Sequence, residues 1–221
     1  MEKEYDIVLI GAGHNALVCA AYLAKAGKKV IVLERLPYIG GGVVTVDGEG
    51  VEVPGVDHIV GKTLPGFKHN LHSTFHEWIF QGPVYWELEL EKYGSKYIWQ
   101  DRTCAMVFSD GSSIIHWQDL DRMVKEIEYF SPKDAKEYRN FINEWMDTAR
   151  FLVAMWFNPP LPDSTIYAQL EGTPLGKELA RNLKCSIRQL VTERFESVHL
   201  RTLMCYEASQ AGVPDDDLGS G

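Results

Sequence analysis

The sequence predicts a doubly wound α/β domain that is only partly present, with α+β structure inserted after its second strand. Three observations predict this class. A strand–helix–strand pattern with glycines fills the opening residues, this rhythm stops after Thr45, and the remaining chain has the pattern of an antiparallel ribbon followed by helices. A doubly wound sheet needs several parallel strands, each with a crossover helix. Only two such strands are recognisable in this sequence.

The strand–helix–strand pattern is clear near the N-terminus. An apolar, β-branched run at 7–10 breaks at Gly11-Ala-Gly13 and passes into a helical stretch of small residues at 15–26. A second apolar run at 30–33 ends in Glu34. Strand, glycine turn, helix, second strand and terminal acid together form a βαβ unit with a dinucleotide-binding pattern, which is typical of a Rossmann-type domain.

Each residue of this pattern has a physical role in holding a dinucleotide. Gly11 permits the tight turn, and Gly13 lets the backbone approach a pyrophosphate, which free amides at the helix start then hold. Glu34 ends the second strand, where a carboxylate accepts hydrogen bonds from an adenosine ribose. Ala16 replaces the third glycine and still allows the helix and strand to pack closely. A tight strand-to-helix turn without a ligand is the alternative.

A second glycine cluster, Gly40 to Gly42, follows shortly after the acidic strand end. A nicotinamide-binding domain would normally run from Glu34 directly into its next helix. Bare backbone at this point favours a longer ligand whose phosphates and ribityl chain continue past the first turn, so the sequence predicts FAD rather than NAD. The expected fold is therefore part of a Rossmann-type FAD-binding domain of the glutathione-reductase-like kind. A flexible loop is the alternative explanation of this cluster.

Composition places the protein among ordinary globular chains. Its 221 residues carry a formal net charge of −9 with scattered acidic residues, which argues against nucleic acid as a partner. The four cysteines form no CxxC pair, so reduced thiols in a cytoplasmic protein are expected. The first strand begins at about residue 5, which leaves no room for a signal peptide, and no apolar run approaches the roughly 20 residues that span a bilayer.

Beyond the glycine clusters the sequence predicts a second domain. A loop-rich stretch is followed by a helix around 85–93 and a strand at 97–99. Asp110-Gly111 is expected to turn a hairpin between strands at 104–109 and 112–117. Signals for helix starts follow at Asp119, at Ser131-Pro132, at Thr173-Pro174 and near Ser197. We therefore expect the N-terminal part of a FAD-binding domain at 1–70, part of a substrate domain at 71–212 and a polar, mobile tail at 213–221.

Four segments of the chain together resemble one known family. They are Gly-Ala-Gly-His-Asn-Ala at 11–16, Glu34-Arg35 followed by Ile-Gly-Gly-Gly at 39–42, Leu-Pro-Gly-Phe-Lys-His at 64–69 and Phe-Ser-Pro-Lys-Asp-Ala-Lys-Glu-Tyr at 130–138. With these residues the chain resembles the phytoene-desaturase-like FAD-dependent oxidoreductases, including their carotene-ketolase-like branch, along essentially all of its length. The resemblance implies dehydrogenation, isomerisation or oxygenation of a lipophilic, often isoprenoid, substrate such as a carotenoid or monoterpene, with the redox work done by the flavin. The electron acceptor stays open among a quinone, oxygen and a carrier protein.

The resemblance also implies a set of cofactor contacts. These are Gly11, Gly13, His14, Asn15 and Ala16 at the pyrophosphate, Glu34 and Arg35 at the adenosine ribose, and Gly41, Gly42 and Val43 along the phosphates towards the flavin. Members of the family are usually about twice this length, and their later half supplies the remaining strands, the rest of the substrate domain and a segment beside the isoalloxazine. The resemblance and the missing strands both predict the N-terminal half of a split enzyme, completed by a second polypeptide.

Three histidines, His69, His72 and His76, are spaced at i, i+3 and i+7. On a helix this spacing would place three imidazoles on one face, a geometry suited to a metal. The resemblance places this segment near the flavin without a metal, so we expect none and assign His69 and His72 as candidate acid–base residues. A loop with surface histidines is the alternative.

The segment from Phe151 to Phe157 is apolar on every side of its two helical turns. Burial in a core or in a subunit interface is the common explanation of such a segment. A wall of a lipophilic substrate channel is the functional alternative, and Trp156 and Phe157 could also dock shallowly on a membrane surface.

Three other functions stay open from the sequence. The first is a non-catalytic or regulatory nucleotide-binding module that descends from such an enzyme. The second is an NAD-linked dehydrogenase, which the cluster Gly40 to Gly42 disfavours. The third is a metal hydrolase built on the three histidines.

Overall fold

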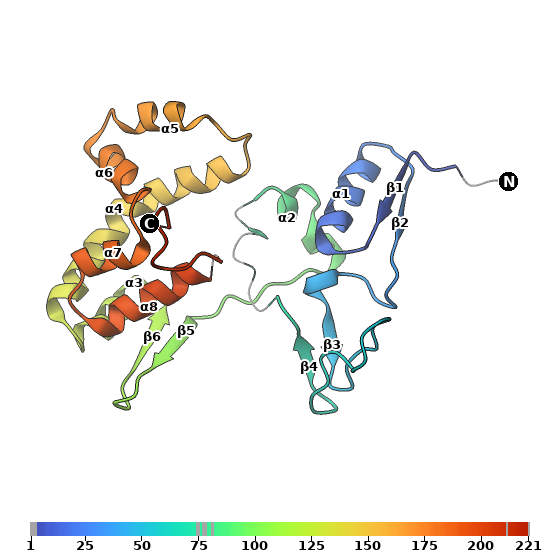
Figure 1. Cartoon of the computed structure of the whole chain (residues 1–221), viewed down its shortest axis with the longest axis horizontal. Helices are drawn as coiled ribbons and strands as arrows, with labels where there is room; N and C mark the ends of the chain where they lie inside the picture. The colour runs from blue at the N-terminus through green and yellow to red at the C-terminus, as the bar shows by residue number, and fades with distance from the viewer. Residues whose placement is uncertain (1–3, 74–75, 77–78, 81, 211, 221) are drawn as a thin grey trace. The chain divides into compact units, whose positions relative to one another are not determined.

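The computed structural model describes residues 4–73, 76, 79–80, 82–210 and 212–220, which fall into two compact units with the division between Lys96 and Tyr97 (Figure 1). The sequence prediction placed residues 71–96 with the substrate domain, whereas by their contacts they group with the first unit. One reason is a pair of hydrogen bonds to Glu87: the Tyr22 hydroxyl donates to its Oε2 at 2.8 Å, and Lys25 Nζ donates to its carbonyl at 2.6 Å.

The first unit begins with the predicted βαβ element, which the structure confirms. Strand β1 (Ile7–Ile10) pairs in parallel with β2 (Val30–Leu33), and α1 (His14–Lys25) lies against the pair (Figure 1). Gly11 ends β1 with a positive φ of 92°, a conformation that residues with a Cβ rarely adopt. The β-branched runs therefore form the strands, and the glycine turn directs the chain into the helix.

A small antiparallel ribbon and three short helical turns follow in the described residues of the first unit. Chain order after β2 is the 3₁₀ turn η1 (Gly41–Val43), β3 (Thr45–Asp47), its partner β4 (Lys68–Asn70), α2 (Val84–Glu87) and the 3₁₀ turn η3 (Leu90–Tyr93). The helix predicted around 85–93 is divided, because Glu89 adopts a left-handed conformation with φ of 51°. The strand predicted at 97–99 is wrong: these residues lie outside any strand, and the next strand begins at Arg102.

The second unit starts with the predicted hairpin. Strands β5 (Arg102–Val107) and β6 (Ser113–Trp117) pair in antiparallel fashion. Asp110 Oδ1 accepts a hydrogen bond from the Ser112 amide at 2.9 Å, and Gly111 takes a φ of 86°. Helices follow as α3 (Leu120–Glu128), α4 (Pro132–Trp156), α5 (Asp163–Leu170), α6 (Pro174–Asn182), α7 (Ile187–Arg194) and α8 (Val198–Ser209).

The predicted helix starts are confirmed as side-chain caps. Asp119, Thr173 and Ser197 each accept a hydrogen bond from an amide in the first turn of α3, α6 and α8, respectively. Ser131 does the same before α4, where its Oγ accepts from the Asp134 amide at 3.1 Å. No helix in the described residues is long and apolar enough to cross a membrane.

The core of the second unit lies between the β5–β6 ribbon and the helices α3, α4, α7 and α8. Its most completely buried side chains are Ile114, Met123, Ile127, Leu200 and Leu203. They come from β6, α3 and α8, so the hairpin and the last helix share one apolar interior. In the apolar segment at 151–157, the side chains of Phe151, Leu152, Ala154 and Met155 lie outside the described residues, whereas Trp156 and Phe157 are exposed.

The C-terminal residues contact the second unit, in contrast to the predicted mobile tail at 213–221. The Arg188 amide donates to the Asp215 carbonyl at 2.8 Å, and the Arg188 guanidinium pairs with the Asp215 carboxylate, also at 2.8 Å. The Gly219 amide donates to the Cys185 carbonyl at 2.9 Å. These bonds join the segment to α7 and to the turn before it.

Candidate nucleotide-binding site

The two glycine clusters meet in the first unit. The Gly40 amide donates to the Ala12 carbonyl at 2.8 Å, and Gly13 and Gly40 form an isolated parallel bridge. Gly40 and Gly41 have positive φ values of 114° and 59°. A Cβ on Gly41 would lie 3.0 Å from the Cα of Gly13, a distance that side chains rarely tolerate. The absence of a side chain therefore lets the two segments form one continuous, glycine-lined surface.

The start of α1 faces this surface with unpaired amides. The first intrahelical bond runs from the Leu17 amide to the Gly13 carbonyl at 3.0 Å, so the amides of the three preceding helical residues have no acceptor within the helix. Among the described residues, no side chain caps this end and none lies within 4 Å of the Cβ position of Gly11 or Gly13. Free amides, the positive end of the helix dipole and open space in front of them fit a pyrophosphate.

Glu34 lies beside the same turn. Its Oε2 accepts a hydrogen bond from the Ala12 amide at 2.6 Å, and its Oε1 accepts one from the Leu36 amide at 2.9 Å. These two bonds hold the pKa of Glu34 below its usual range, so the carboxylate is ionised at neutral pH. The structure thus places Glu34 beside the glycine turn, and the role of Glu34 and Arg35 at an adenosine ribose stays a prediction.

The two candidate acid–base histidines lie close to the second glycine cluster. The His72 Cβ is 3.8 Å from the position of a Cβ on Gly42, and the His72 residue is exposed. His69 is on β4 opposite Val46, and its Nε2 is buried without a hydrogen-bond partner among the described residues. Because His69 belongs to a strand, the helical register that would align three imidazoles for a metal is absent. The catalytic role of His69 and His72 stays a prediction.

A second polar cluster, which sequence reasoning missed, lies in the second unit. Cys104 Sγ donates to Glu207 Oε1 at 3.3 Å, and His116 Nδ1 closely contacts the same oxygen. Burial, followed by the charge of Glu207, raises the pKa of the Cys104 thiol to about 11, so it stays protonated as a donor. These residues come from β5, β6 and α8. The three residues are far apart in the sequence. The one sequence signal for this cluster is the place of Cys104 in the alternation of its strand, on the side that faces the interior.

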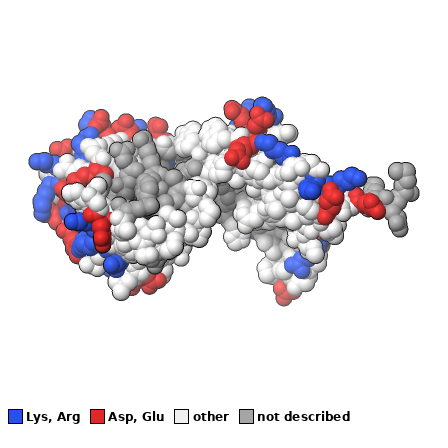
Figure 2. Space-filling view, turned by 90° about the horizontal axis from the view of Figure 1, so that it is seen from above, with Lys and Arg blue, Asp and Glu red and all other residues white. Residues whose placement is uncertain are grey.

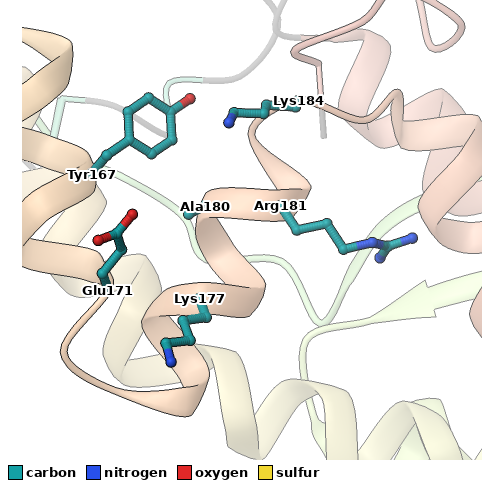
Figure 3. A pocket seen from close by; sticks show the side chains of 6 residues that line it. All are labelled: Tyr167, Glu171, Lys177, Ala180, Arg181 and Lys184. Atoms are coloured by element: carbon teal, nitrogen blue, oxygen red, sulfur yellow. The ribbon is translucent and has the colours of Figure 1, made fainter.

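Two of the cavities in the described part of the chain lie among the helices of the second unit. One, of about 570 Å³, is lined by Tyr167 and Glu171 on one side and by Lys177, Ala180, Arg181 and Lys184 on the other (Figure 3). Lys184 Nζ lies 4.7 Å from the centre of the Tyr167 ring, so these two lining residues form a cation–π contact with each other. Lys, Arg, Asp and Glu are interspersed on the face shown in Figure 2. We assign no ligand to this smaller cavity.

Comparisons with known proteins agree with this geometry. Residues 9–76, which include Glu34 and the second glycine cluster, match the family described as the NAD(P)-binding Rossmann-like domain. A limonene dehydrogenase subunit of Castellaniella defragrans is 30% identical over 220 residues, which cover 99% of this chain and 37% of that protein. Pyridine nucleotide-disulfide oxidoreductase domain-containing protein 2 of Mus musculus is 29% identical over 234 residues, which cover 94% of this chain and 38% of that protein.

A solved structure shares the fold. Wild-type putrescine oxidase bound to putrescine superimposes with a TM-score of 0.51 at 17% identity, over 98% of this chain and 40% of that one. The chain therefore spans 37–40% of the length of these matched proteins. Together, the comparisons and the βαβ geometry show a Rossmann-like, dinucleotide-binding segment.

Proposed function

We propose that the chain is the FAD-binding part of a flavin-dependent oxidoreductase that acts on a hydrophobic, terpenoid substrate. The observation that carries this proposal is the meeting of the two glycine clusters at the amide-rich start of α1, with Glu34 beside it. When bound, FAD supplies a hydride acceptor for dehydrogenation of an activated C–H bond. The chain's own residues bind the pyrophosphate at α1 and orient the dinucleotide along the turn Gly40–Gly42.

The choice of FAD over NAD depends on the second glycine cluster. The matched family is described as an NAD(P)-binding domain, and the glycine turn that defines it suits either NAD or FAD. Gly40 and Gly41 extend the bare backbone beyond that turn, which suits the longer pyrophosphate–ribityl chain of FAD.

The substrate class and the need for a partner are supported by one relative. The Castellaniella protein is a subunit of a dehydrogenase that is named for the monoterpene limonene, and it aligns with nearly all of this chain. This supports a lipophilic substrate and a heteromeric enzyme. The wider resemblance to phytoene-desaturase-like enzymes supports the same class of substrate.

The open face of the β1–β2 pair supports completion by a second polypeptide. The paired strands place Val8 and Ile10 on the face away from α1, where they are 55% and 89% exposed, with Leu33 beside Ile10 at 49%. Parallel sheets are normally covered on both faces, and bare strand edges are poorly tolerated. We propose that the partner adds strands and cover here, through an interface larger than the roughly 1,600 Å² of a standard complex.

Two further features support details of the proposal. All four cysteines are free thiols, which supports work in a reducing, cytoplasmic compartment. The exposed Trp156 and Phe157 support peripheral contact with a membrane as a source of lipophilic substrate.

Purification at native expression levels tests the proposal. We expect a flavin absorbance band and, by mass spectrometry, a second polypeptide in stoichiometric amount. Recovery of NAD without a flavin band would refute the cofactor assignment. A chain that is active and loaded with FAD by itself would refute the partner.

A non-catalytic nucleotide-binding module is the second candidate, and one observation favours it. Both oxygens of Glu34 are already occupied by the amides of Ala12 and Leu36, so the turn is satisfied by its own backbone. Anaerobic addition of limonene to the flavin-loaded complex separates the two functions. Bleaching of the flavin band supports the enzyme, and an unchanged band with every terpene tested supports the module.

A further inference from the structure

The larger cavity of the second unit has apolar walls and the size of a small-molecule site. It is an open pocket of about 790 Å³ between α4, α6, α7 and α8, within the range of roughly 300–1,000 Å³ that ligand sites occupy. Its aromatic wall is formed by Tyr138, Phe141, Trp145 and Phe195. Ring centres lie 6.4 Å apart for Tyr138–Phe195 and 6.1 Å apart for Phe141–Phe195, so these rings pack on one another as a fixed surface.

Charged residues at the cavity are paired with each other. Arg194 bonds to Glu137 and Glu144, and Arg181 pairs with Glu193. These side chains are partly exposed, so the pairs are in contact with solvent. The core of an obligate protein interface is depleted in charge. A polar, self-satisfied rim around an apolar interior therefore favours a small molecule over a partner polypeptide as the occupant.

The lining of the cavity includes a polar group suited to a hydroxyl. His116 and Glu207 both line the cavity. Among the described residues His116 makes its contacts through Nδ1, to the Glu207 carboxylate and to Thr103 Oγ1 at 2.9 Å. The Thr103 hydroxyl can donate its hydrogen to the His116 carbonyl at 3.4 Å. Its oxygen can then accept a hydrogen bond from Nδ1 of the His116 ring. A carboxylate only accepts, so Nδ1 carries a proton, and in the neutral imidazole Nε2 then carries the lone pair that accepts a hydrogen bond.

We infer that this cavity binds a lipophilic alcohol of terpenoid size, with its hydrocarbon body against the aromatic wall and its hydroxyl donating to His116 Nε2. The inference rests on the proposed function, because it gives the terpenoid substrate a place in this chain. It adds a polar anchor, which distinguishes an alcohol from the parent hydrocarbon. A hydrogen bond made in an apolar site is worth about tenfold in affinity.

Equilibrium dialysis of the native, flavin-loaded protein tests the inference with two probes of similar skeleton, limonene and α-terpineol. We expect α-terpineol to bind about tenfold more tightly than limonene. His116→Leu should remove this preference and keep the binding of limonene. Equal affinities for the two probes in the wild type, or a preference that survives in His116→Leu, would overturn the hydroxyl anchor.

A second variant tests the cavity itself. Ala208 lines it from α8, so Ala208→Phe should fill the space and weaken both probes at least tenfold. Ala168→Phe, on the exposed side of α5, is the matched control and should leave binding unchanged. Unaltered binding in Ala208→Phe, with helix content retained by circular dichroism, would place the probes elsewhere and overturn the inference.

The flavin absorbance of each sample separates this inference from the proposed function. A flavin band without binding of either probe would overturn the cavity assignment and leave the cofactor assignment standing. Binding of α-terpineol to a protein without flavin would refute the proposed cofactor and retain the cavity.

Discussion

At the scale of single residues, Gly41 is the point where the backbone of the second glycine cluster comes close to the backbone of the first, at Gly13. A Cβ there would lie 3.0 Å from Gly13 Cα, on a residue whose φ is 59°. Gly41→Ala should therefore push the two glycine clusters apart and lower bound flavin about tenfold, measured by absorbance per chain. Gly55→Ala is the matched control, because Gly55 shares a positive φ of 84° but has nothing within 4 Å among the described residues. Its strain is about 1 kcal/mol, and flavin should be retained.

Glu34 provides a pH-dependent test at the same scale. Its carboxylate accepts two backbone hydrogen bonds, led by that from Ala12, and its pKa lies below the usual 4.5. Since the folded pKa is the lower one, the stabilisation is present above the unfolded pKa and is lost as pH falls through the folded value. The Ala12 and Leu36 amide resonances should titrate together with a midpoint below 4.5. In Glu34→Gln this titration should disappear, and its persistence would show that another group controls the turn.

Residues of the nucleotide turn could be predicted because their requirements are local. Gly11, Gly13 and Glu34 follow from the length of one strand, one turn and one helix. Cys104 and Glu207 could not be predicted in the same way, since their contact depends on how α8 packs on the hairpin. His69 was predicted as a functional residue from resemblance, and its place on β4 became visible only from the pairing with β3.

At the scale of elements, Asp134 joins two helices. It is fully buried on α4, and its carboxylate accepts hydrogen bonds from the Glu196 amide at 3.1 Å and from the Ser197 amide at 2.7 Å, at the start of α8. Asp134→Asn should lower the free energy of unfolding by about 2–3 kcal/mol. The reason is that the side-chain NH₂ group of asparagine, a hydrogen-bond donor, would face the backbone N–H donors of Glu196 and Ser197. Urea unfolding measures the loss. Asp121→Asn, exposed in the first turn of α3, should change stability by less than about 0.5 kcal/mol. Equal losses in the two variants would show that the junction is unimportant.

Helix and hairpin boundaries were predictable where a side chain or a glycine decides them locally. Asp119, Thr173 and Ser197 form caps as predicted, and Gly111 turns the hairpin. The helix expected around 85–93 failed because Glu89 adopts a left-handed conformation, which its residue type does not favour. The C-terminal segment was expected to be mobile because it is polar, and its bonds to α7 depend on tertiary packing.

At the scale of the whole molecule, chain order predicted a sheet with further strands, and the structure shows which side chains the β1–β2 pair leaves exposed. Chain order could predict the two parallel strands β1 and β2, because strands and crossover helices have recognisable patterns. It could not reveal which face α1 would cover. That face follows from the alternation in β1, where Ile7 and Leu9 are half-buried and Val8 and Ile10 are exposed.

The bare face yields the last prediction, which concerns assembly. Val8 is exposed in the chain alone, so Val8→Lys should leave the stability of the isolated chain within about 0.5 kcal/mol of the wild type. If a second polypeptide covers this face, the same change buries an unpaired ammonium in an apolar interface and should abolish co-purification of the partner. Leu64→Lys, at a loop residue that is 69% exposed, is the matched control and should retain the partner. Quantitative mass spectrometry of affinity-purified complexes measures both. Partner recovery that is equal in the two variants would mean that the partner, if present, docks away from the β1–β2 face.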